Sequence, residues 1–333
     1  MKVASTPASS FSQIMAWLRR GRISPPQAVK MAMDLRRRTA KPTSAQAAAE
    51  VEALRQARVK SVLAELDGLI GLAGVKRHVR EIYAFQSMGL RRTALGLAHE
   101  QAGLHMVFTG NPGTGKTTVA RILGRLFKEM GLVSQGHIVE VERADLVGEY
   151  IGHTAQKTRE VIKRATGGLL FIDEAYSLAR GGEKDFGKES IDCLVRAMEE
   201  QRGQLVMILA GYPWEMADFL SQNPGLKSRL PLVISFPDYV PEELLAIAEG
   251  MWREREYELG ADARAYLHSV IYGPRWSARG EEGNARAIRN LVERSLRCHA
   301  LRLVGRSDLT RAELITVCRS DLEQTVREWK RDH

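Results

Sequence analysis

The octapeptide GNPGTGKT, Gly110 to Thr117, decides the fold of this chain. It follows an apolar stretch, Leu104–Thr109, and it opens a helical pattern that begins at Thr118. A phosphate chain must approach bare backbone amides at such a turn, which requires glycines. Lys116 supplies positive charge to the β and γ phosphates, and the Thr117 hydroxyl is placed to ligate Mg²⁺. The stretch therefore predicts a P-loop that binds a nucleoside triphosphate.

The residues of this segment that we expect to bind the nucleotide share one turn and the start of one helix. They are Gly110, Asn111, Pro112, Gly113, Thr114, Gly115, Lys116, Thr117 and Thr118.

A second motif, LLFIDEAYSL, begins with the apolar run Leu169–Ile172 and continues into Asp173 and Glu174. Two acids after a buried strand are costly unless they serve at the edge of the sheet, where α/β folds bind ligands. Asp173 is expected to hold Mg²⁺, directly or through water. Glu174 is expected to orient or deprotonate the attacking water. An Asn-Lys-x-Asp sequence, the usual reader of guanine, is missing, so ATP is favoured over GTP.

Apolar and β-branched runs alternate with helical stretches from about Asp67 to Pro237. Such alternation predicts an α/β fold with a parallel five-stranded sheet between helices. The strands that we expect are Leu104–Thr109, His137–Glu142, Leu169–Asp173, Leu205–Ala210 and Leu232–Phe236.

Strand signals vanish beyond Pro241, and helical patterns take their place. Thr310 with Glu313 forms a capping box for the last of them. We therefore expect three domains: a helical N-terminal extension at 1–66, a large α/β ATPase domain at 67–239 and a small all-helical lid at 240–333. The lid helices that we expect are Glu242–Glu258, Ala261–Tyr272, Asn284–Val304 and Arg311–Arg327.

Net charge is concentrated in the extension. The chain carries +9, of which the first 66 residues contribute +8. Ser24-Pro25 followed by Gln27 predicts a helix start within the extension, and another helix is expected from about Ser44 to Leu66. Two interpretations are open: a helical hairpin that packs on the main body or on a neighbour, and a basic surface that recruits an acidic partner.

We expect neither a secretory signal nor a membrane-spanning helix from this sequence. Its start lacks a secretory pattern, and its longest apolar runs are far below the roughly 20 residues of a spanning helix. The chain has three cysteines without metal-site spacing. These features predict a cytoplasmic protein.

Longer motifs resemble one family. They are ERADLVGEYIGHTAQKT from Glu142, GGLLFIDEAYSLARGGEKDFGKE from Gly167, and NPGLKSR from Asn223. From about Leu66 to about Asp321 the chain resembles the AAA+ ATPases, and within them the group of stage V sporulation protein K. The resemblance implies a nucleotide-dependent homo-oligomeric ring, a hexamer, with ATP between the large domains of adjacent subunits.

The resemblance also implies residue roles. Ile70 and Gly71 match the segment that wraps adenine, although a plain helix-entry turn is the alternative. Arg229 matches the arginine finger that reaches the neighbour's γ-phosphate, with a surface salt bridge as the alternative. The planar, permanently charged guanidinium group of arginine is suited to contact a γ-phosphate. Arg286 matches the sensor-2 arginine of the lid, and Arg289 is a competing candidate.

Tyr150, Ile151 and Gly152 match the central-pore loop of ring translocases. An exposed aromatic there can grip an extended chain without reading its sequence, unless Tyr150 packs under its own loop. A second loop, which begins at Gly181, could also line the pore, and Phe186 is its only aromatic residue. Tyr212 stands where many AAA+ proteins place a polar phosphate sensor, and its role is open.

These features favour a motor that hydrolyses ATP to remodel or thread a protein client in sporulation. A remodeller like the red-type Rubisco activases is the first alternative, since its motifs are the same. A nucleic-acid motor is a further one, although the near-neutral charge outside the extension argues against it. A nucleotide-gated scaffold is the third. The client is not identified by the motifs.

Overall fold

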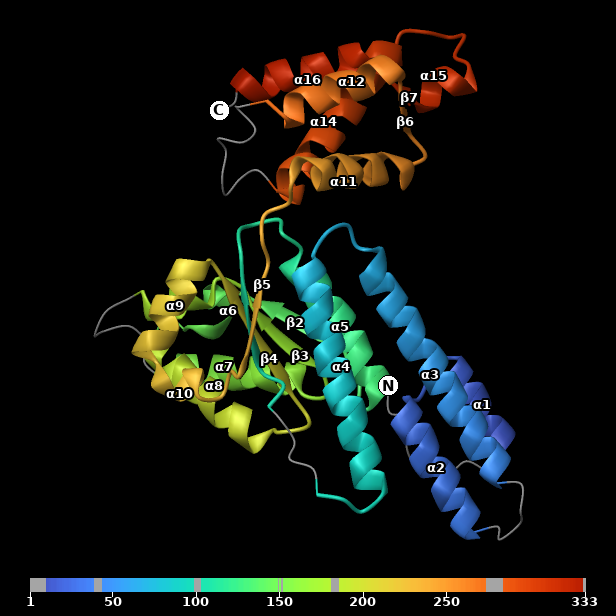
Figure 1. Cartoon of the computed structure of the whole chain (residues 1–333). Helices are drawn as coiled ribbons and strands as arrows, with labels where there is room; N and C mark the ends of the chain where they lie inside the picture. The colour runs from blue at the N-terminus through green and yellow to red at the C-terminus, as the bar shows by residue number, and fades with distance from the viewer. Residues whose placement is uncertain are drawn as a thin grey trace. The chain divides into compact units, whose positions relative to one another are not determined.

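The computed structural model describes residues 10–38, 44–98, 103–148, 150, 152–180, 186–273 and 284–331. The chain divides into two compact units (Figure 1). One comprises residues 1–69, 74–109 and 117–235, and the other 70–73, 110–116 and 236–333. None of the described helices combines the length and the hydropathy that crossing a bilayer requires.

The first unit is built on a parallel sheet of five strands in the order β2-β3-β4-β1-β5. The predicted five-stranded sheet is confirmed, with ends that differ from the expected ones by at most two residues. The strands are β1 (Met106–Thr109), β2 (Ile138–Val141), β3 (Leu169–Ile172), β4 (Val206–Gly211) and β5 (Leu232–Ser235).

Helices cover both faces of the sheet, as Figure 1 shows. Helices α4 (Ala73–Ala94) and α5 (Lys116–Met130) lie on one face, and α7 (His153–Ala165) and α8 (Gly187–Glu200) lie on the other. Strands β3 and β4 are buried along their whole length, which explains why their sequences are continuously apolar. Shorter elements on the second face are α6 (Arg143–Leu146), η1 (Ala175–Ala179), α9 (Pro213–Gln222) and α10 (Pro224–Lys227).

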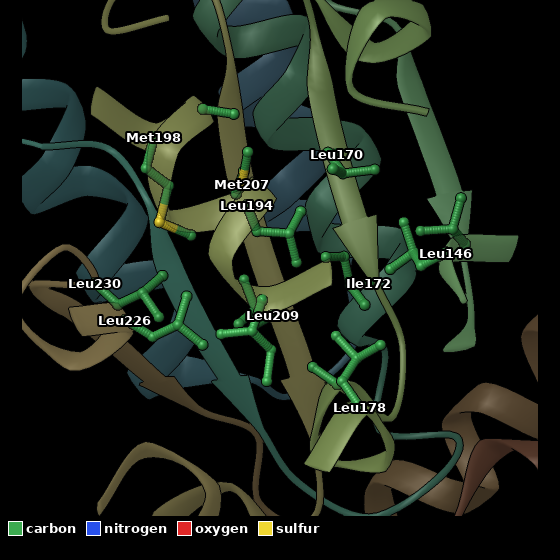
Figure 2. Close-up of a cluster of buried hydrophobic side chains, with 14 of the residues drawn as sticks. Leu146, Leu170, Ile172, Leu178, Leu194, Met198, Met207, Leu209, Leu226 and Leu230 are labelled. Atoms are coloured by element: carbon green, nitrogen blue, oxygen red, sulfur yellow. The ribbon is translucent and has the colours of Figure 1, made fainter. Parts of the chain in front are cut away.

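Alternate strand residues separate the two cores. Leu170 and Ile172 of β3 join Met207 of β4 in the cluster shown in Figure 2, against α7 and α8. On the opposite face, Phe108 and Phe171 meet edge to face with ring centroids 6.5 Å apart. Dense apolar packing on both sides leaves no polar side chain within the central strands β3 and β4.

The N-terminal extension forms three helices, α1 (Phe11–Arg19), α2 (Pro25–Arg38) and α3 (Ser44–Gly68). The expected start of α2 is confirmed, because the Gln27 side chain accepts a hydrogen bond from the Ser24 amide at 2.9 Å. Ile14, Leu18 and Val51 are among the buried residues of a small core that belongs to these helices alone.

Arginines fasten this extension to the main body. Arg55 of α3 donates through Nε to the Glu129 carbonyl at 3.1 Å and through Nη2 to the Met130 carbonyl at 2.5 Å. These carbonyls belong to the last turn of α5, where carbonyl groups lack partners within the helix and carry negative dipole charge. The extension therefore packs on the main body, as one of our two interpretations predicted.

The lid core belongs to the second unit and is helical, as predicted. Its helices are α11 (Pro241–Arg253), α12 (Ala261–Ile271), α14 (Ala285–Leu303), α15 (Arg311–Ile315) and α16 (Arg319–Arg331). Two strands of two residues, β6 (Glu258–Leu259) and β7 (Thr316–Val317), pair in parallel and were not predicted.

Strand β7 corrects the expected helix Arg311–Arg327. The Thr310–Glu313 capping box forms, but it starts a helix of only five residues. The β-branched pair Thr316–Val317 then extends, and its Val317 carbonyl accepts from the Gly260 amide at 3.1 Å. A second helix begins afterwards. The expected helix Glu242–Glu258 likewise ends early, at Arg253.

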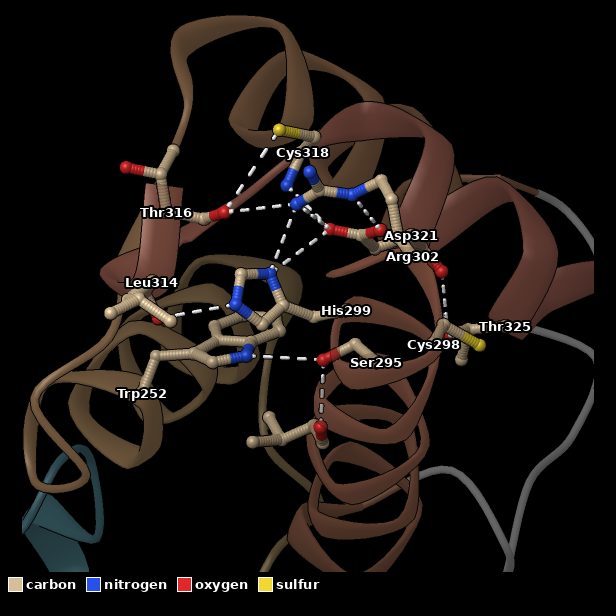
Figure 3. Close-up of polar contacts among 11 residues, drawn as sticks. Trp252, Ser295, Cys298, His299, Arg302, Leu314, Thr316, Cys318, Asp321 and Thr325 are labelled. Carbon is tan, nitrogen blue, oxygen red and sulfur yellow. Dashed lines mark hydrogen bonds and ion pairs between the residues drawn. The ribbon is translucent and has the colours of Figure 1, made fainter. Parts of the chain in front are cut away.

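A buried ionic network joins the lid helices (Figure 3). Arg302 of α14 donates to both carboxylate oxygens of Asp321 on α16, at 2.8 and 3.0 Å. Burial alone would raise the pKa of Asp321, but hydrogen bonds from Arg302 and the Cys318 amide outweigh it and lower that pKa below its ordinary 3.8. The side chain of Asp321 is 2% exposed. Its negative charge therefore stabilises the folded lid.

Asp321→Asn is expected to lower the free energy of unfolding by about 2 kcal/mol, since it removes the charge from a buried carboxylate that accepts two hydrogen bonds from Arg302. The measurement is urea unfolding followed by circular dichroism. Glu323→Gln on the same helix is the matched control, because its ion pairs are exposed and worth less than about 1 kcal/mol.

The pH dependence gives a second check. The folded pKa of Asp321 is depressed, so its contribution is complete above the unfolded value and is lost as pH falls through the folded value. The difference between wild type and Asp321→Asn should shrink below about pH 4. A difference that stays constant down to pH 3 would contradict the ionic origin of the effect.

Candidate nucleotide-binding and hydrolysis site

The loop Gly110–Lys116 leaves the carboxyl end of β1 and runs into the first turn of α5. Gly110 and Gly113 have φ of 155° and 76°, a region that favours glycine. A Cβ atom on Gly113 would lie 2.7 Å from the backbone nitrogen of Arg286. The loop is therefore a cradle of bare backbone at a helix N-terminus, the arrangement that binds phosphate groups.

Side chains of the loop hold its shape. Lys116 donates through Nζ to the carbonyl oxygens of Gly110 and Asn111, at 2.7 and 2.9 Å. The buried Thr114 hydroxyl donates to the Asn111 carbonyl at 2.8 Å. Lys116 is thus curled over the cradle where phosphate oxygens are expected. Of the other expected nucleotide ligands, Pro112 lies in the loop, and Thr117 and Thr118 lie in the first turn of α5.

The segment Ile70–Leu72 lies beside this loop. A Cβ atom on Gly115 would lie 3.5 Å from Cδ1 of Leu72. Gly71 and Leu72 both have left-handed backbone, with φ of 65° and 57°, and the Glu243 carboxylate packs against Gly71 where a Cβ atom would stand. The structure thus brings the predicted adenine segment, including the half-buried Ile70, to the P-loop.

Arg286 lies in the first turn of α14, and its backbone is close to the loop at Gly113. Arg289 lies one turn further along the helix, and both side chains are exposed. The proximity of Arg286 to the cradle favours it over Arg289 as the lid arginine.

Asp173 and Glu174 follow β3 at the carboxyl edge of the sheet. The Asp173 amide donates to the Val141 carbonyl of β2 at 2.9 Å, and the Glu174 amide donates to Asp173 Oδ1 at 3.0 Å. Glu174 has φ of 45°, which is uncommon for a residue with a side chain and is typical of strained functional positions. This turn leaves its carboxylate exposed.

Strand β4 lies between β1 and β3, so all three end at the same edge of the sheet. Tyr212 directly follows β4, and its ring lies 6.1 Å from the ring of Tyr176. Burial, and then the Glu174 carboxylate, raise the pKa of Tyr176 to about 12. The guanidinium of Arg180 covers the Tyr176 ring at 4.7 Å. Tyr212 therefore stands at the catalytic edge, although its sensing role stays a prediction.

Oxygen donors at this edge suit Mg²⁺. That ion is held by few protein oxygens together with phosphate oxygens and water, so one hydroxyl and one carboxylate are an adequate protein contribution. Thr117 and Asp173 offer that pair. No group of three or more metal-ligating side chains is found among the residues that the structure describes.

Arg229 lies just after α10 and contacts Glu199 at the end of α8. Its Nε atom donates to Glu199 Oε1 at 3.0 Å, and Nη1 donates to the Gly225 carbonyl at 2.8 Å. The salt bridge that we considered as the alternative is thus formed. It also fixes the direction of the guanidinium at one side of the first unit.

Tyr150 lies between α6 and α7 and is 66% exposed. The rings of Tyr150 and His153 pack edge to face, with their centroids 5.5 Å apart. Gly152 has φ of 82° at the start of α7. Ile151 lies outside the described residues, as do residues 181–185 of the second expected loop; Phe186 of that loop directly precedes α8.

The segment that leads into the Tyr150 loop is held by α7. The Gly148 amide donates to the Thr154 hydroxyl at 2.9 Å, and the buried Thr158 hydroxyl donates to the Leu146 carbonyl at 2.9 Å. The exposure of Tyr150 argues against the alternative that it packs under its own loop.

Four residues near these sites were missed from the sequence: Glu199, Asp238, Tyr239 and Asn284. Asp238 and Tyr239 follow β5 at the carboxyl edge of the sheet, a position that could have drawn attention to them. Glu199 has no local signal, because only the packing of α8 brings it to Arg229.

Comparisons with known proteins agree with this geometry. Residues 106–237 match the ATPase family associated with various cellular activities (AAA), and residues 240–332 match the AAA lid domain. Stage V sporulation protein K of Bacillus subtilis is 49% identical over 84% of this chain and 89% of its own length. The chloroplastic ribulose bisphosphate carboxylase/oxygenase activase of Cyanidioschyzon merolae is 44% identical over 80% of this chain and 92% of its own.

A solved structure, the FIGL-1 AAA domain in complex with ADP, shares the fold with a TM-score of 0.55 and 16% identity. The matched region spans 78% of this chain and 82% of the FIGL-1 chain. The chain has a P-loop after β1, two acids after β3 and a helical lid, and its relatives match it over most of its length. It therefore belongs to the AAA family of ATP-hydrolysing enzymes.

Proposed function

We propose that this ATPase assembles into a homo-oligomeric ring, a hexamer, and uses ATP hydrolysis to remodel or thread a protein client. The observation that supports this most directly is Tyr150, an exposed aromatic on a loop whose preceding segment is hydrogen-bonded to α7. An aromatic ring in that setting can pack on an extended polypeptide without selecting a sequence. A scaffold that only switches would not require it.

The site residues divide the chemical work. Lys116 and the amides of the P-loop bind and orient the phosphates. Thr117 and Asp173 would hold Mg²⁺, which neutralises negative charge on the phosphates when bound. Glu174 would orient or deprotonate the attacking water, since phosphoryl transfer depends mainly on positioning and charge neutralisation. Ile70 and Gly71 would contact the adenine, and Arg286 the γ-phosphate from the lid.

Arg229 is proposed to act on ATP bound by a neighbouring subunit. A permanently charged, planar guanidinium is suited to stabilise charge that develops in the transition state. Glu199 then holds the finger ready at the subunit surface, and the exchange of Glu199 for phosphate oxygens accompanies ring assembly.

Two clients are compatible with the relatives. The relative from Bacillus subtilis is named for stage V of sporulation, which favours a client in spore formation. The relative named as a ribulose bisphosphate carboxylase/oxygenase activase supports a remodeller of that enzyme as the second candidate. A Glu174→Gln ring used as a trap in cell lysate, with captured proteins identified by mass spectrometry, separates the two. The cytoplasmic location stays a prediction from the sequence.

Glu174→Gln is expected to retain ATP binding, because Lys116 and the loop amides are unchanged. Turnover should fall at least about a hundredfold when water activation is lost. Equilibrium binding and phosphate release are measured on the same preparation, with Glu200→Gln, an exposed acid of α8, as the control. Loss of ATP binding in a folded variant would show that Glu174 is structural instead.

Arg229→Ala is expected to bind ATP normally and to lose about 10³-fold in turnover. The decisive test is mixing with Lys116→Ala subunits, which carry an intact finger but a defective P-loop. If Arg229 acts in trans, mixed rings should recover part of the turnover. Mixed rings that form and stay inactive at every ratio would place Arg229 outside the intersubunit site.

Tyr150→Ala is expected to preserve assembly and basal ATP turnover while client remodelling collapses. Burial of the ring against a client is worth about 1.5–3 kcal/mol per engaged loop. Tyr150→Phe keeps the ring and should keep the activity, so it serves as the matched control. The measurement pairs ATP turnover with unfolding or release of the trapped client; normal remodelling by Tyr150→Ala would refute threading.

A further inference from the structure

Asn284 precedes α14 as its N-cap residue, yet its side chain makes no capping hydrogen bond. Asparagine is among the best capping residues, because its oxygen can accept from the free amides of the first turn. Here Oδ1 accepts from the Tyr239 amide at 3.0 Å, and Nδ2 donates to Asp238 Oδ1 at 2.8 Å. Asn284 is only 2% exposed. Its polar atoms therefore serve the segment after β5 rather than its own helix.

Asp238 connects this residue to the phosphate loop. Both of its carboxylate oxygens accept from Asn111 Nδ2 at 3.0 Å. Oδ1 is thus shared between Asn111 of the loop and Asn284 of the lid. Hydrogen bonds to an ionised carboxylate are stronger than neutral ones. One exposed carboxylate thereby bridges two amide side chains from distant parts of the chain.

Tyr239 makes a second connection. Its hydroxyl donates to the Thr114 carbonyl at 3.2 Å, and its ring packs on the apolar core of the lid. Burial, and then the Glu243 carboxylate, raise the pKa of Tyr239 to about 12, so the hydroxyl keeps its proton at neutral pH. Two neighbouring residues therefore tie two points of the loop to the lid.

We infer that Asp238 is a positioning residue of the ATPase: through Asn111 and Asn284 it holds the first turn of α14, and with it Arg286, against the phosphate loop. The inference rests on the proposed role of Arg286. We expect its effect on ATP to depend on Arg286, because Asn284, which bonds Asp238, directly precedes the helix whose first turn carries Arg286.

Asp238→Ala in the full-length chain tests this by a double-mutant cycle with Arg286→Ala. The probe is ATP, titrated with Mg²⁺ in the Glu174→Gln background so that it is not consumed. Asp238→Ala alone should weaken ATP binding about tenfold, which is about 1.4 kcal/mol. In the Arg286→Ala background the same change should alter affinity by no more than about twofold. Asp308→Ala, an exposed acid of the lid, is the control for loss of one negative charge.

Each other outcome overturns the inference. An equal loss of ATP affinity in both backgrounds would show that Asp238 shapes the loop independently of Arg286. No loss of affinity in either background would show that the hydrogen bonds of Asp238 do not affect ATP binding. If Asp238→Ala lowers the melting temperature, Asp238→Asn replaces it, since it keeps the shape of the side chain and removes only its charge; a smaller loss that again vanishes with Arg286→Ala is expected. The wild-type assays with client test the proposed function separately, because the cycle requires neither a ring nor a client.

Discussion

Burial of the central strands on both faces is the constraint on which the rest of the first unit depends. Strands β3 and β4 have no exposed residue, so neither can carry a polar group along its length. Chemistry is therefore confined to the residues that follow the strands. Because the strands are parallel, these positions all occur at one edge. The P-loop, Asp173 and Tyr212 follow three adjacent strands for this reason.

The left-handed backbone conformation at Glu174 is strained, and packing of the sheet around it offsets the strain energy. Glu174 adopts left-handed φ although it is not a glycine, and the bond from its amide to Asp173 Oδ1 holds it there. Strain of this kind persists only where the surroundings determine it, here a fully buried strand before the turn and the buried residues of η1 after it. The result is a carboxylate that is directed outward on a rigid support.

The sequence was sufficient for the sheet, the P-loop and the acids because each depends on local pattern. Runs of apolar residues mark strands that are buried on both faces, and glycines mark the positions of positive φ. It was insufficient where long-range packing decides. The short pair β6–β7 has only two residues in each strand, too few for a periodic signal, and Thr316–Val317 lies inside a helical pattern. Likewise, nothing near Glu199 in sequence indicates Arg229, thirty residues away.

The same reasoning explains why Asp238 and Asn284 were overlooked. Each looks ordinary in its local context, an acid after a strand and an asparagine before a helix, and either could be a simple cap. Only the structure shows that the cap is unused and that both side chains are directed to each other. The loop 110–116 groups with the lid rather than with the strand and helix that it connects covalently. The polar bonds at Asn111 and Thr114 are the contacts by which Asp238 and Tyr239 hold this loop within its own unit.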